Sequence, residues 1–433
     1  MKFLHISALP VWPLEGKGGM PSLRETLRGH VRAGHEVVLA LPKFNIIGDY
    51  AKPVTVRDDE GYKVVLMKCH WAPALAAVRR FARRIGGGNE MPYPLRWVLN
   101  IVLCVLLTFS LLLVAFRLRF IEKQKFNLVY AHNQYSALAG WIIGTLFKAP
   151  NVTRLYGTFL ADLIGKPLVW LRYPVATMGF LVPHSLLICA NDGTRGDQVA
   201  KKLGIDISKF RFWQNGVDLP SHPPGTTRAK MLEQYQSRGL RADSQWILSC
   251  SRLSYWKRID RILHALKYAY QEGCDCQLLV AGNGAEYEKL VTLTEGLDLV
   301  DEVIWLGAVA HEQIWELMHV TDLFMITNDV TNRCNPLFEA ICAGLPIVSI
   351  NDPSTADLLI HGENALLTDK DDLEGLGANL LKVCQDCSLA AKLRSAQQAH
   401  ASGFWSWTER LEAEVRELES LVTTGKLLDS TQH

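Results

Sequence analysis

The sequence predicts an α/β protein made of two Rossmann-like, doubly wound parallel-sheet domains that face a central cleft. Two observations predict this fold. Short apolar segments of strand length alternate with helical patterns, which is typical of parallel sheets with crossover helices. The alternation stops at Pro220–Thr227, a stretch rich in Pro, Ser and Gly, and then starts again. The length of 433 residues also fits two or three domains, because a domain has roughly 150 residues.

The first domain is expected to span residues 1–220. A helical pattern formed by Leu23, Leu27 and Val31 follows its first apolar segment. Apolar runs bounded by turn residues indicate buried strands. The expected strands cover residues 2–7, 36–41, 63–68, 128–131, 152–156 and 186–190.

The second domain is expected to span residues 228–405, and a separate charged amphipathic helix to span 406–425. The alternation of strands and helices starts again here. The expected strands cover residues 246–251, 277–281, 303–306, 323–326 and 347–350. The expected helices cover residues 259–270, 285–293, 313–318 and 337–342.

Composition excludes several classes of protein. Apolar residues make up 48% of the chain and charged residues 21%, which is ordinary for a globular protein and rules out a disordered, collagen-like or multi-span membrane chain. The net charge of +2 (46 − 44) argues against nucleic acid as a partner. The 10 cysteines are scattered, and no second pair stands at zinc spacing beside Cys384 and Cys387, so we expect reduced thiols in a cytoplasmic protein. The apolar run at the N-terminus lacks the length of a signal peptide.

One segment departs from this soluble pattern. Trp97–Phe116 has 20 residues and no charge, and a helix of that length spans about 30 Å, the thickness of a bilayer core. Between Lys68 and Lys125 the chain carries ten basic and two acidic residues, a local charge of +8. A transmembrane span, an interfacial helix and a buried helix of a soluble protein all fit this segment. Because strands on both sides belong to one expected sheet, we favour a peripheral or monotopic helix on an anionic membrane surface, with a single transmembrane helix over 97–116 as the less favoured alternative.

Two features of the first domain are candidates for ligand contact. Gly18 and Gly19 belong to a glycine-rich turn after the first strand, where backbone N–H groups can approach a phosphate, although a flexible turn has the same composition. His132 stands just past another strand, where it could meet a sugar or serve a structural role.

The second domain begins with two cations near the end of its first strand. Arg252 and Lys257 could bind a diphosphate, the former as a fork and the latter as a point charge, or they could be solvated. The turns at Gly282 and at Leu306 follow the next two strands, and neither is distinctive alone.

A further candidate is the start of the helix expected near residue 337. Pro336 suits the first helical turn, whose free N–H groups could hold a phosphate. Glu339 lies one turn further and could accept hydrogen bonds from ribose hydroxyls or stabilise the helix dipole.

Taken in order, these pieces resemble glycosyltransferase family 4 and its GT-B architecture. The resemblance covers about residues 1–50 and 125–420, and it adds an Asn-Gly-Val-Asp motif at 215–218 to the features above. It implies a retaining, nucleotide-sugar-dependent glycosyltransferase of the EC 2.4 class with no cofactor and no required metal. Arg252 and Lys257 would neutralise the diphosphate, and Glu339 would hold the ribose. The base would lie near Gly282 and Leu306, and His132 and Gly19 would approach from the first domain. Backbone groups of a short run would support the phosphates or the sugar: Cys334, Asn335, Pro336 and Leu337.

The chain departs from the family at one position. The family usually carries a Glu eight residues before the position of Glu339, and this chain has Thr331 there. Asp329 and Arg333 are candidates to replace it, the latter through an acidic sugar or a phosphate.

The expected activity is transfer of a sugar from a nucleoside-diphosphate sugar to a lipid-linked or glycan acceptor at the cytosolic face of a membrane. Two alternatives stay open. Thr331 could mark a non-catalytic, nucleotide-sugar-binding partner of another transferase. A GT-B nucleotide-sugar epimerase fits the Asn335–Glu339 block less well.

Overall fold

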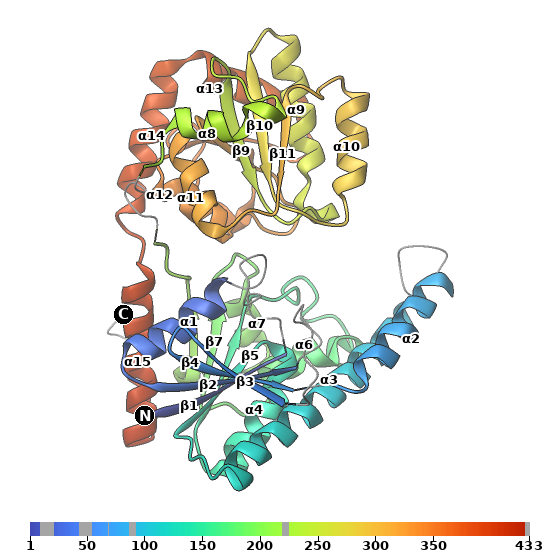
Figure 1. Ribbon diagram of the computed structural model, residues 1–433, viewed down its shortest axis with the longest axis vertical. Coiled ribbons are helices and arrows are strands. Elements are labelled where there is room, and N and C mark those ends of the chain that lie inside the picture. Colours follow the sequence, from blue (N-terminus) through green and yellow to red (C-terminus); the bar gives the residue numbers. More distant parts are fainter. Residues whose placement is uncertain (9–20, 43–53, 68, 86–91, 219–224, 429–433) are drawn as a thin grey trace. The chain divides into compact units, whose positions relative to one another are not determined.

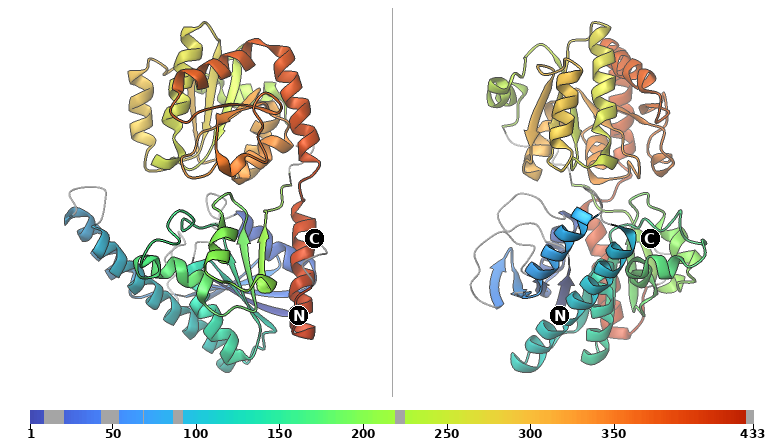
Figure 2. Two further views of the ribbon diagram at one scale, coloured as in Figure 1. Left: turned by 180° about the vertical axis from the view of Figure 1, so that it is seen from behind. Right: turned by 90° about the vertical axis from the view of Figure 1, so that its right-hand side faces the viewer.

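The computed structural model describes residues 1–8, 21–42, 54–67, 69–85, 92–218 and 225–428. The chain forms two compact units. Unit 1 comprises Met1–Asn215 together with Trp407–His433, and unit 2 comprises Gly216–Ser406. Each unit is an α/β domain with its own sheet (Figures 1 and 2).

The sheet of unit 1 has eight strands in the order β3-β4-β2-β1-β5-β6-β7-β8. Only the β3–β4 pair is antiparallel. The strands are β1 (Lys2–Ser7), β2 (Glu36–Pro42), β3 (Val54–Asp59), β4 (Tyr62–Met67), β5 (Leu128–His132), β6 (Asn151–Leu155), β7 (Leu186–Ala190) and β8 (Phe210–Trp213). The sequence did not predict β3, a polar edge strand, or β8, which has only four residues.

Helices cover both faces of this sheet (Figure 1). Strand residues alternate between the faces, so Leu4 and Ile6 pack with α3 and α4 while Phe3 packs with α15. The helices are α1 (Pro21–Arg32), α2 (Ala72–Ile85), α3 (Tyr93–Phe116), α4 (Gln134–Phe147), α5 (Val169–Arg172), α6 (Pro174–Leu181), α7 (Gly196–Lys202) and α15 (Trp407–Thr424), with short turns η2 (Arg117–Ile121) and η3 (Ile207–Lys209).

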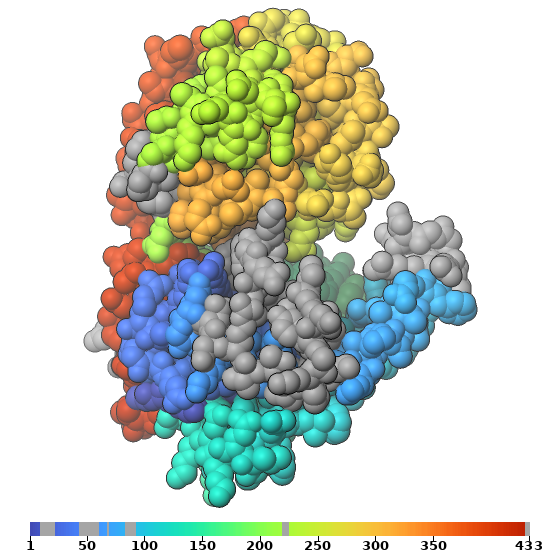
Figure 3. Space-filling view, in the orientation of Figure 1, coloured from blue at the N-terminus to red at the C-terminus, as the bar shows by residue number. Residues whose placement is uncertain are grey.

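The apolar helix α3 is longer than the segment from which it was predicted. Together with η2 it forms the stretch Tyr93–Ile121, which is long and apolar enough to cross a membrane and is 44% buried over its most apolar window. Leu111, Val114 and Leu118 belong to the core between this helix and the sheet. The helix α2 packs against its N-terminal half and stands away from the rest of unit 1 (Figure 3).

Unit 2 contains a six-stranded, all-parallel sheet in the order β11-β10-β9-β12-β13-β14. The strands are β9 (Gln245–Cys250), β10 (Cys276–Ala281), β11 (Val303–Gly307), β12 (Leu323–Ile326), β13 (Ile347–Ile350) and β14 (Ala365–Thr368). The helices are α8 (Arg228–Tyr235), α9 (Ile259–Gln271), α10 (Tyr287–Gly296), α11 (His311–Val320), α12 (Asn335–Cys342), α13 (Leu373–Gln385) and α14 (Cys387–Ala401), with turns η4 (Gln236–Arg238), η5 (Tyr255–Lys257) and η6 (Pro353–Thr355). Apolar clusters fill both faces of the sheet.

These two sheets confirm the predicted pair of doubly wound α/β domains with an apolar helix in the first. Counted along the chain, the strand order of unit 2 is 3-2-1-4-5-6, the doubly wound order of dinucleotide-binding folds. The boundary between the units falls after Asn215 and again after Ser406, and α15 belongs to unit 1. Three of its charged side chains, Arg410, Glu414 and Glu417, are fully buried.

Candidate functional site

The loops of unit 2 that follow β9 and β12 lie at the topological switch point of its sheet. In open α/β sheets ligands bind beyond the carboxyl ends of the strands at this point. Backbone hydrogen bonds join the loops there: Asp329 N donates to Trp256 O at 2.9 Å, Ser251 N to Ala281 O at 3.0 Å, and Gly282 N to Gly307 O at 2.8 Å. The turns after four neighbouring strands are therefore held together at one edge.

Two glycines allow this close contact between turns. A Cβ atom at Gly282 would collide with the backbone oxygen of Ser251, and one at Gly284 with that of Leu253. Gly282 also has a φ of +151°, which favours glycine. These glycines hold the segment that carries Arg252, so their role in the described structure is one of packing.

Arg252 and Lys257 are the cations of this edge. Arg252 is exposed, while Lys257 is 9% exposed with its Nζ 4.1 Å from the centre of the Trp256 ring. Burial lowers the pKa of Lys257, and the nearby Arg252 lowers it further, while the thiols of Cys334 and Cys250 oppose the shift. Within the described ranges no carboxylate pairs with either cation. One buried and one exposed positive charge without an acidic partner form a favourable place for an anion.

The first turn of α12 lies close to these cations. Cys334 is its N-cap and interacts electrostatically with Lys257, and Pro336 occupies the first turn as predicted from sequence. Leu337 is fully buried, whereas Asn335 is partly exposed. The helix start therefore presents backbone groups near the ammonium of Lys257.

The carboxylate of Glu339, on the same helix, is already engaged by a histidine. Glu339 is 6% exposed, and its Oε1 lies 2.7 Å from Nε2 of His311, the first residue of α11. Sequence reasoning missed His311, because no spacing relates it to Glu339. A ribose hydroxyl bound by Glu339 would share the carboxylate with this ring.

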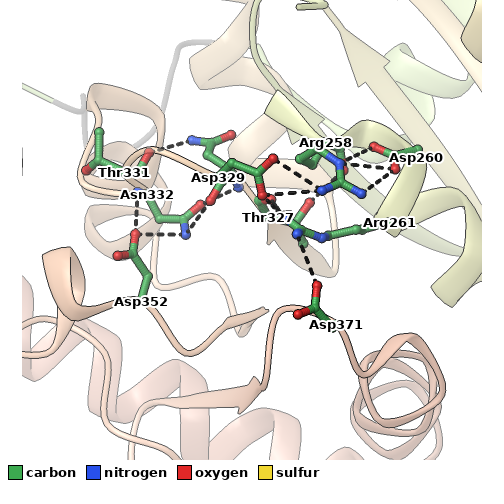
Figure 4. Close-up of polar contacts among 10 residues, drawn as sticks. Arg258, Asp260, Arg261, Thr327, Asp329, Thr331, Asn332, Asp352 and Asp371 are labelled. Carbon is green, nitrogen blue, oxygen red and sulfur yellow. Dashed lines mark hydrogen bonds and ion pairs between the residues drawn. The ribbon is translucent and has the colours of Figure 1, made fainter. Parts of the chain in front are cut away.

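The loop after β12 is a dense polar network, shown in Figure 4. The Asp329 carboxylate pairs with Arg258 at 3.2 Å and with Arg261 at 2.7 Å. Oγ1 of Thr331 lies 2.9 Å from Oγ of Ser354. Asn332 donates from its backbone and its side chain to Asp352. The two residues expected to replace the missing Glu are thus both part of ion pairs, because Arg333 pairs with Asp357 at 2.6 Å. Their predicted contact with a sugar stays a prediction.

In unit 1 the structure places His132 inside the protein. Its side chain is fully buried, with Nε2 2.9 Å from His5 Nδ1 and Nδ1 2.8 Å from the Tyr156 hydroxyl. The ring therefore has no nitrogen left for a sugar in this arrangement. Gly18 and Gly19 lie outside the described residues, so their predicted role is not examined by the structure.

In the described ranges, no group of three or more His, Cys, Asp or Glu side chains is arranged to hold a metal ion. The expected independence from a metal stays a prediction.

Comparison with known proteins adds the chemical class. Residues 231–400 match the family described as glycosyl transferases group 1. The chain is 27% identical over 148 residues to a 2-deoxystreptamine N-acetyl-D-glucosaminyltransferase from Niallia circulans, which covers 34% of this chain and 38% of that enzyme. It is 21% identical over 289 residues to the UDP-Gal:alpha-D-GlcNAc-diphosphoundecaprenol alpha-1,3-galactosyltransferase of Escherichia coli, covering 66% and 73%.

The fold is also found in solved structures. The crystal structure of Anabaena Alr3699/HepE with UDP and glucose matches with a TM-score of 0.67 at 20% identity, over 97% of this chain and all of the other. These findings confirm the GT-B type of fold and the glycosyltransferase class of the matched domain, while membership of family 4 stays a prediction.

Proposed function

We propose that the protein is a retaining glycosyltransferase that moves a sugar from a nucleoside diphosphate to a lipid-linked or glycan acceptor at the cytosolic face of a membrane. The observation that carries the proposal is the pair of cations, Arg252 and Lys257, without a carboxylate partner in the described ranges, at the switch point of a domain that matches group 1 glycosyl transferases. The donor class is supported by the UDP bound in the HepE structure and by the UDP-Gal in the name of the E. coli relative.

The chemistry follows from where charge develops. The bond between the sugar C1 and the diphosphate oxygen breaks, the acceptor oxygen bonds to C1, and the acceptor proton passes to the departing diphosphate. Negative charge grows on the departing diphosphate, and fixed cations that are partly removed from water stabilise it strongly. Arg252 would bind two phosphate oxygens as a fork, and Lys257 with the first turn of α12, including Cys334, would hold the phosphate next to the sugar.

The remaining predicted contacts are part of the same proposal. Glu339, held by His311, would accept hydrogen bonds from the ribose, and the base would lie near Gly282 and Leu306.

A ligand screen tests the donor. Unfolding of the purified protein is followed with UDP-, GDP- and ADP-sugars, since a ligand that binds only the folded state raises the melting temperature by mass action. One nucleotide class should raise it in a concentration-dependent way, with product formed only when an acceptor is added. No shift with any of the three would contradict the proposal. Binding without transfer to any acceptor would favour the non-catalytic alternative, which Thr331 supports.

Membrane association rests on the outer face of α3. Its exposed apolar residues recur every three or four positions and form one stripe on the face opposite the core contacts. They are 38–60% exposed, and they are Val98, Val102, Val105, Phe109, Leu113 and Phe116, with Phe120 of η2 continuing the stripe. The short helix α5 lies beside the N-terminal end of α3, because Trp97 donates to the Leu171 carbonyl at 2.7 Å, and it adds the exposed Trp170.

The basic residues around this face favour an anionic bilayer as the surface to which it binds. Arg80, Arg96 and Lys123 are exposed beside or near the ends of α3. Because the other side of α3 belongs to the core of unit 1, the helix would lie in the interface rather than cross the membrane.

Vesicle sedimentation tests this face. The wild type should pellet with anionic phosphatidylglycerol vesicles and less in high salt, and Phe109→Asp should reduce binding by roughly tenfold or more. Val300→Asp is the matched control, because Val300 is equally exposed (61% against 60%) but lies in unit 2. Equal sedimentation of wild type and Phe109→Asp would overturn the docking face.

A further inference from the structure

A chain of buried polar side chains runs through unit 1 on the side of the sheet covered by α1 and α15. It begins at the Tyr156 hydroxyl, which lies 2.8 Å from His132 Nδ1. His132 Nε2 lies 2.9 Å from His5 Nδ1, and His5 Nε2 lies 3.2 Å from His30 Nδ1. His30 Nε2 faces Glu414 Oε1 at 3.3 Å. The three histidines and the glutamate are fully buried.

The glutamate at the end of this chain is ionised. Burial alone would raise the pKa of Glu414, but Arg410 and Arg154 hold it well below its usual range. Arg410 Nη1 lies 2.9 Å and Arg154 Nη1 3.5 Å from Glu414 Oε2, and the Tyr130 hydroxyl donates to Oε1 at 2.7 Å.

The two histidines of the chain nearest to Tyr156, His132 and His5, are neutral. Burial lowers the pKa of His5 and of His132 well below 6.5, and the neighbouring His30 adds to this for both. Arg154 contributes to the lowering for His132, while Glu414 opposes it for both rings. A neutral imidazole has one N–H donor and one acceptor nitrogen, so each ring must choose which nitrogen carries its proton.

That choice is dictated from one end. A carboxylate accepts hydrogen bonds only, so a His30 ring that carries one proton places it on Nε2, which faces Glu414 Oε1 at 3.3 Å, and leaves Nδ1 as an acceptor. His5 must then donate from Nε2, which leaves its Nδ1 to accept from His132 Nε2. His132 Nδ1 is finally an acceptor, and the Tyr156 hydroxyl must donate to it. Every ring therefore has the same tautomer, and all hydrogen bonds point toward Glu414.

We propose that Glu414 of α15 fixes the tautomers of His30, His5 and His132 in series and so sets the hydrogen-bond role of Tyr156. The chain is a relay with two states. When one proton enters at the Tyr156 oxygen, the Tyr156 proton moves to His132 Nδ1, that of His132 Nε2 to His5 Nδ1, and that of His5 Nε2 to His30 Nδ1. The result is one His30 imidazolium facing Glu414, with the three hydrogen bonds between Tyr156 and His30 reversed, the contact with Glu414 kept, and no other change in charge.

The relay ends at the predicted acceptor-side site, and in this respect it rests on the proposed function. His132 is the last residue of β5 and is paired with Ser7 at the end of β1, and β1 and β5 form the switch point of this sheet. His132 is thus a positioning residue that acts through Tyr156, which follows β6 and is only partly buried. In the resting state the lone pairs of Tyr156 are free to accept a hydrogen bond from a hydroxyl group of a ligand.

Nitrogen NMR of the ¹⁵N-histidine-labelled full chain tests the relay without any ligand. At neutral pH all three rings should show a protonated Nε2 and an unprotonated Nδ1. His5→Phe keeps the stacking with Tyr130, whose ring lies 4.8 Å away, but removes both nitrogens. In that variant His30 should keep its tautomer, and His132 should change to a mixture with protonated Nδ1. His264→Phe, in unit 2, is the control and should leave the three signals unchanged.

An Nδ1-protonated ring among the three in the wild type, or an unchanged His132 in His5→Phe, would overturn the relay. Neither result depends on enzymatic activity. Conversely, if the tautomers are as stated but no nucleotide sugar raises the melting temperature, the relay stands and the proposed function fails. If sugar transfer is measurable, Tyr156→Phe should change the transfer rate at least tenfold on the acidic side of the pH profile. The rise in melting temperature caused by the donor should stay the same.

Discussion

The sheets of the two units have the same switch-point topology, but among the described residues the polar side chains near that point are unpaired cations in one unit and a hydrogen-bonded network in the other. In unit 2 the loop after β9 presents Arg252 and Lys257 without carboxylate partners in the described ranges. In unit 1 His5 of β1 and His132 at the end of β5 are buried, and His132 is hydrogen-bonded to His5 and to the partly buried Tyr156, which follows β6. A cation without a partner can bind an anionic ligand. A network of paired side chains is rigid and fixes the direction of its hydrogen bonds. The comparison therefore fits the proposed function, in which unit 2 binds the charged donor, and it shows that the polar side chains of unit 1 are held by one another.

The largest expected effect breaks the buried network. Glu414→Ala leaves Arg154 and Arg410 buried without their carboxylate, and the loss of one partner of a buried ion pair costs about 3–5 kcal/mol. Urea unfolding should show this loss of stability in unit 1. Glu412→Ala is the control on the same helix, because Glu412 is exposed and its loss should change stability by less than about 0.5 kcal/mol. Equal effects of the two variants would contradict the assignment of the network.

The next effect concerns the cations of unit 2. Arg252→Ala and Lys257→Met each remove a charge-assisted contact worth about 1.5–3 kcal/mol, so each should weaken donor binding roughly 10- to 100-fold. Isothermal titration with the nucleotide sugar found by the screen measures this. Lys289→Ala removes a cation that is exposed and paired with Glu286, and it should leave the affinity unchanged. Full donor affinity in Arg252→Ala would remove the main support for the proposed function.

The strand pattern and the two cations could be predicted from sequence because they depend on local order. Buried parallel strands read as apolar runs, and Arg252 and Lys257 stand at fixed distances from such a run. The paired networks could not be predicted in this way. Tyr130 and Glu414 are 284 residues apart, and only the return of α15 to unit 1 brings them together. Arg410 and Glu414 at i and i+4 have the spacing of a solvated helical pair, and burial, not spacing, distinguishes them. The short strand β14 was not predicted for the same reason: its tertiary environment, and not its local sequence, makes it a strand.

The pH dependence of stability sharpens the comparison further. His5 and His132 have folded pKa values well below 6.5, so the unfolded chain takes up protons first as the pH falls. The free energy of unfolding is therefore highest above about pH 6.5. It declines at lower pH, by at most about 1.4 kcal/mol per pH unit for each histidine. His5→Phe removes one of these contributions and should flatten the decline between pH 6.5 and 5, measured by urea unfolding of both proteins. An unchanged slope would mean that His5 binds a proton equally in the folded and unfolded chain.

The smallest expected effect concerns Asp329 in the loop after β12. It decides whether the ion pairs of this loop only hold the loop together, as the buried network does in unit 1, or whether the loop also binds the donor, as proposed for the cations of unit 2. The Asp329 carboxylate is 36% exposed and lies between Arg258 and Arg261, so its ion pairs are partly screened by water. If it serves only the loop, Asp329→Ala should cost about 1 kcal/mol of stability and change the donor KM less than twofold. If it replaces the Glu that Thr331 does not provide, the donor KM should rise about tenfold, because a hydrogen bond from a sugar hydroxyl to a charged group is lost. Arg333→Ala is the parallel variant, since Arg333 is similarly paired with Asp357. The ion pairs already made by both residues favour the first outcome, and a tenfold rise in KM for Asp329→Ala alone would identify that carboxylate as the sugar ligand.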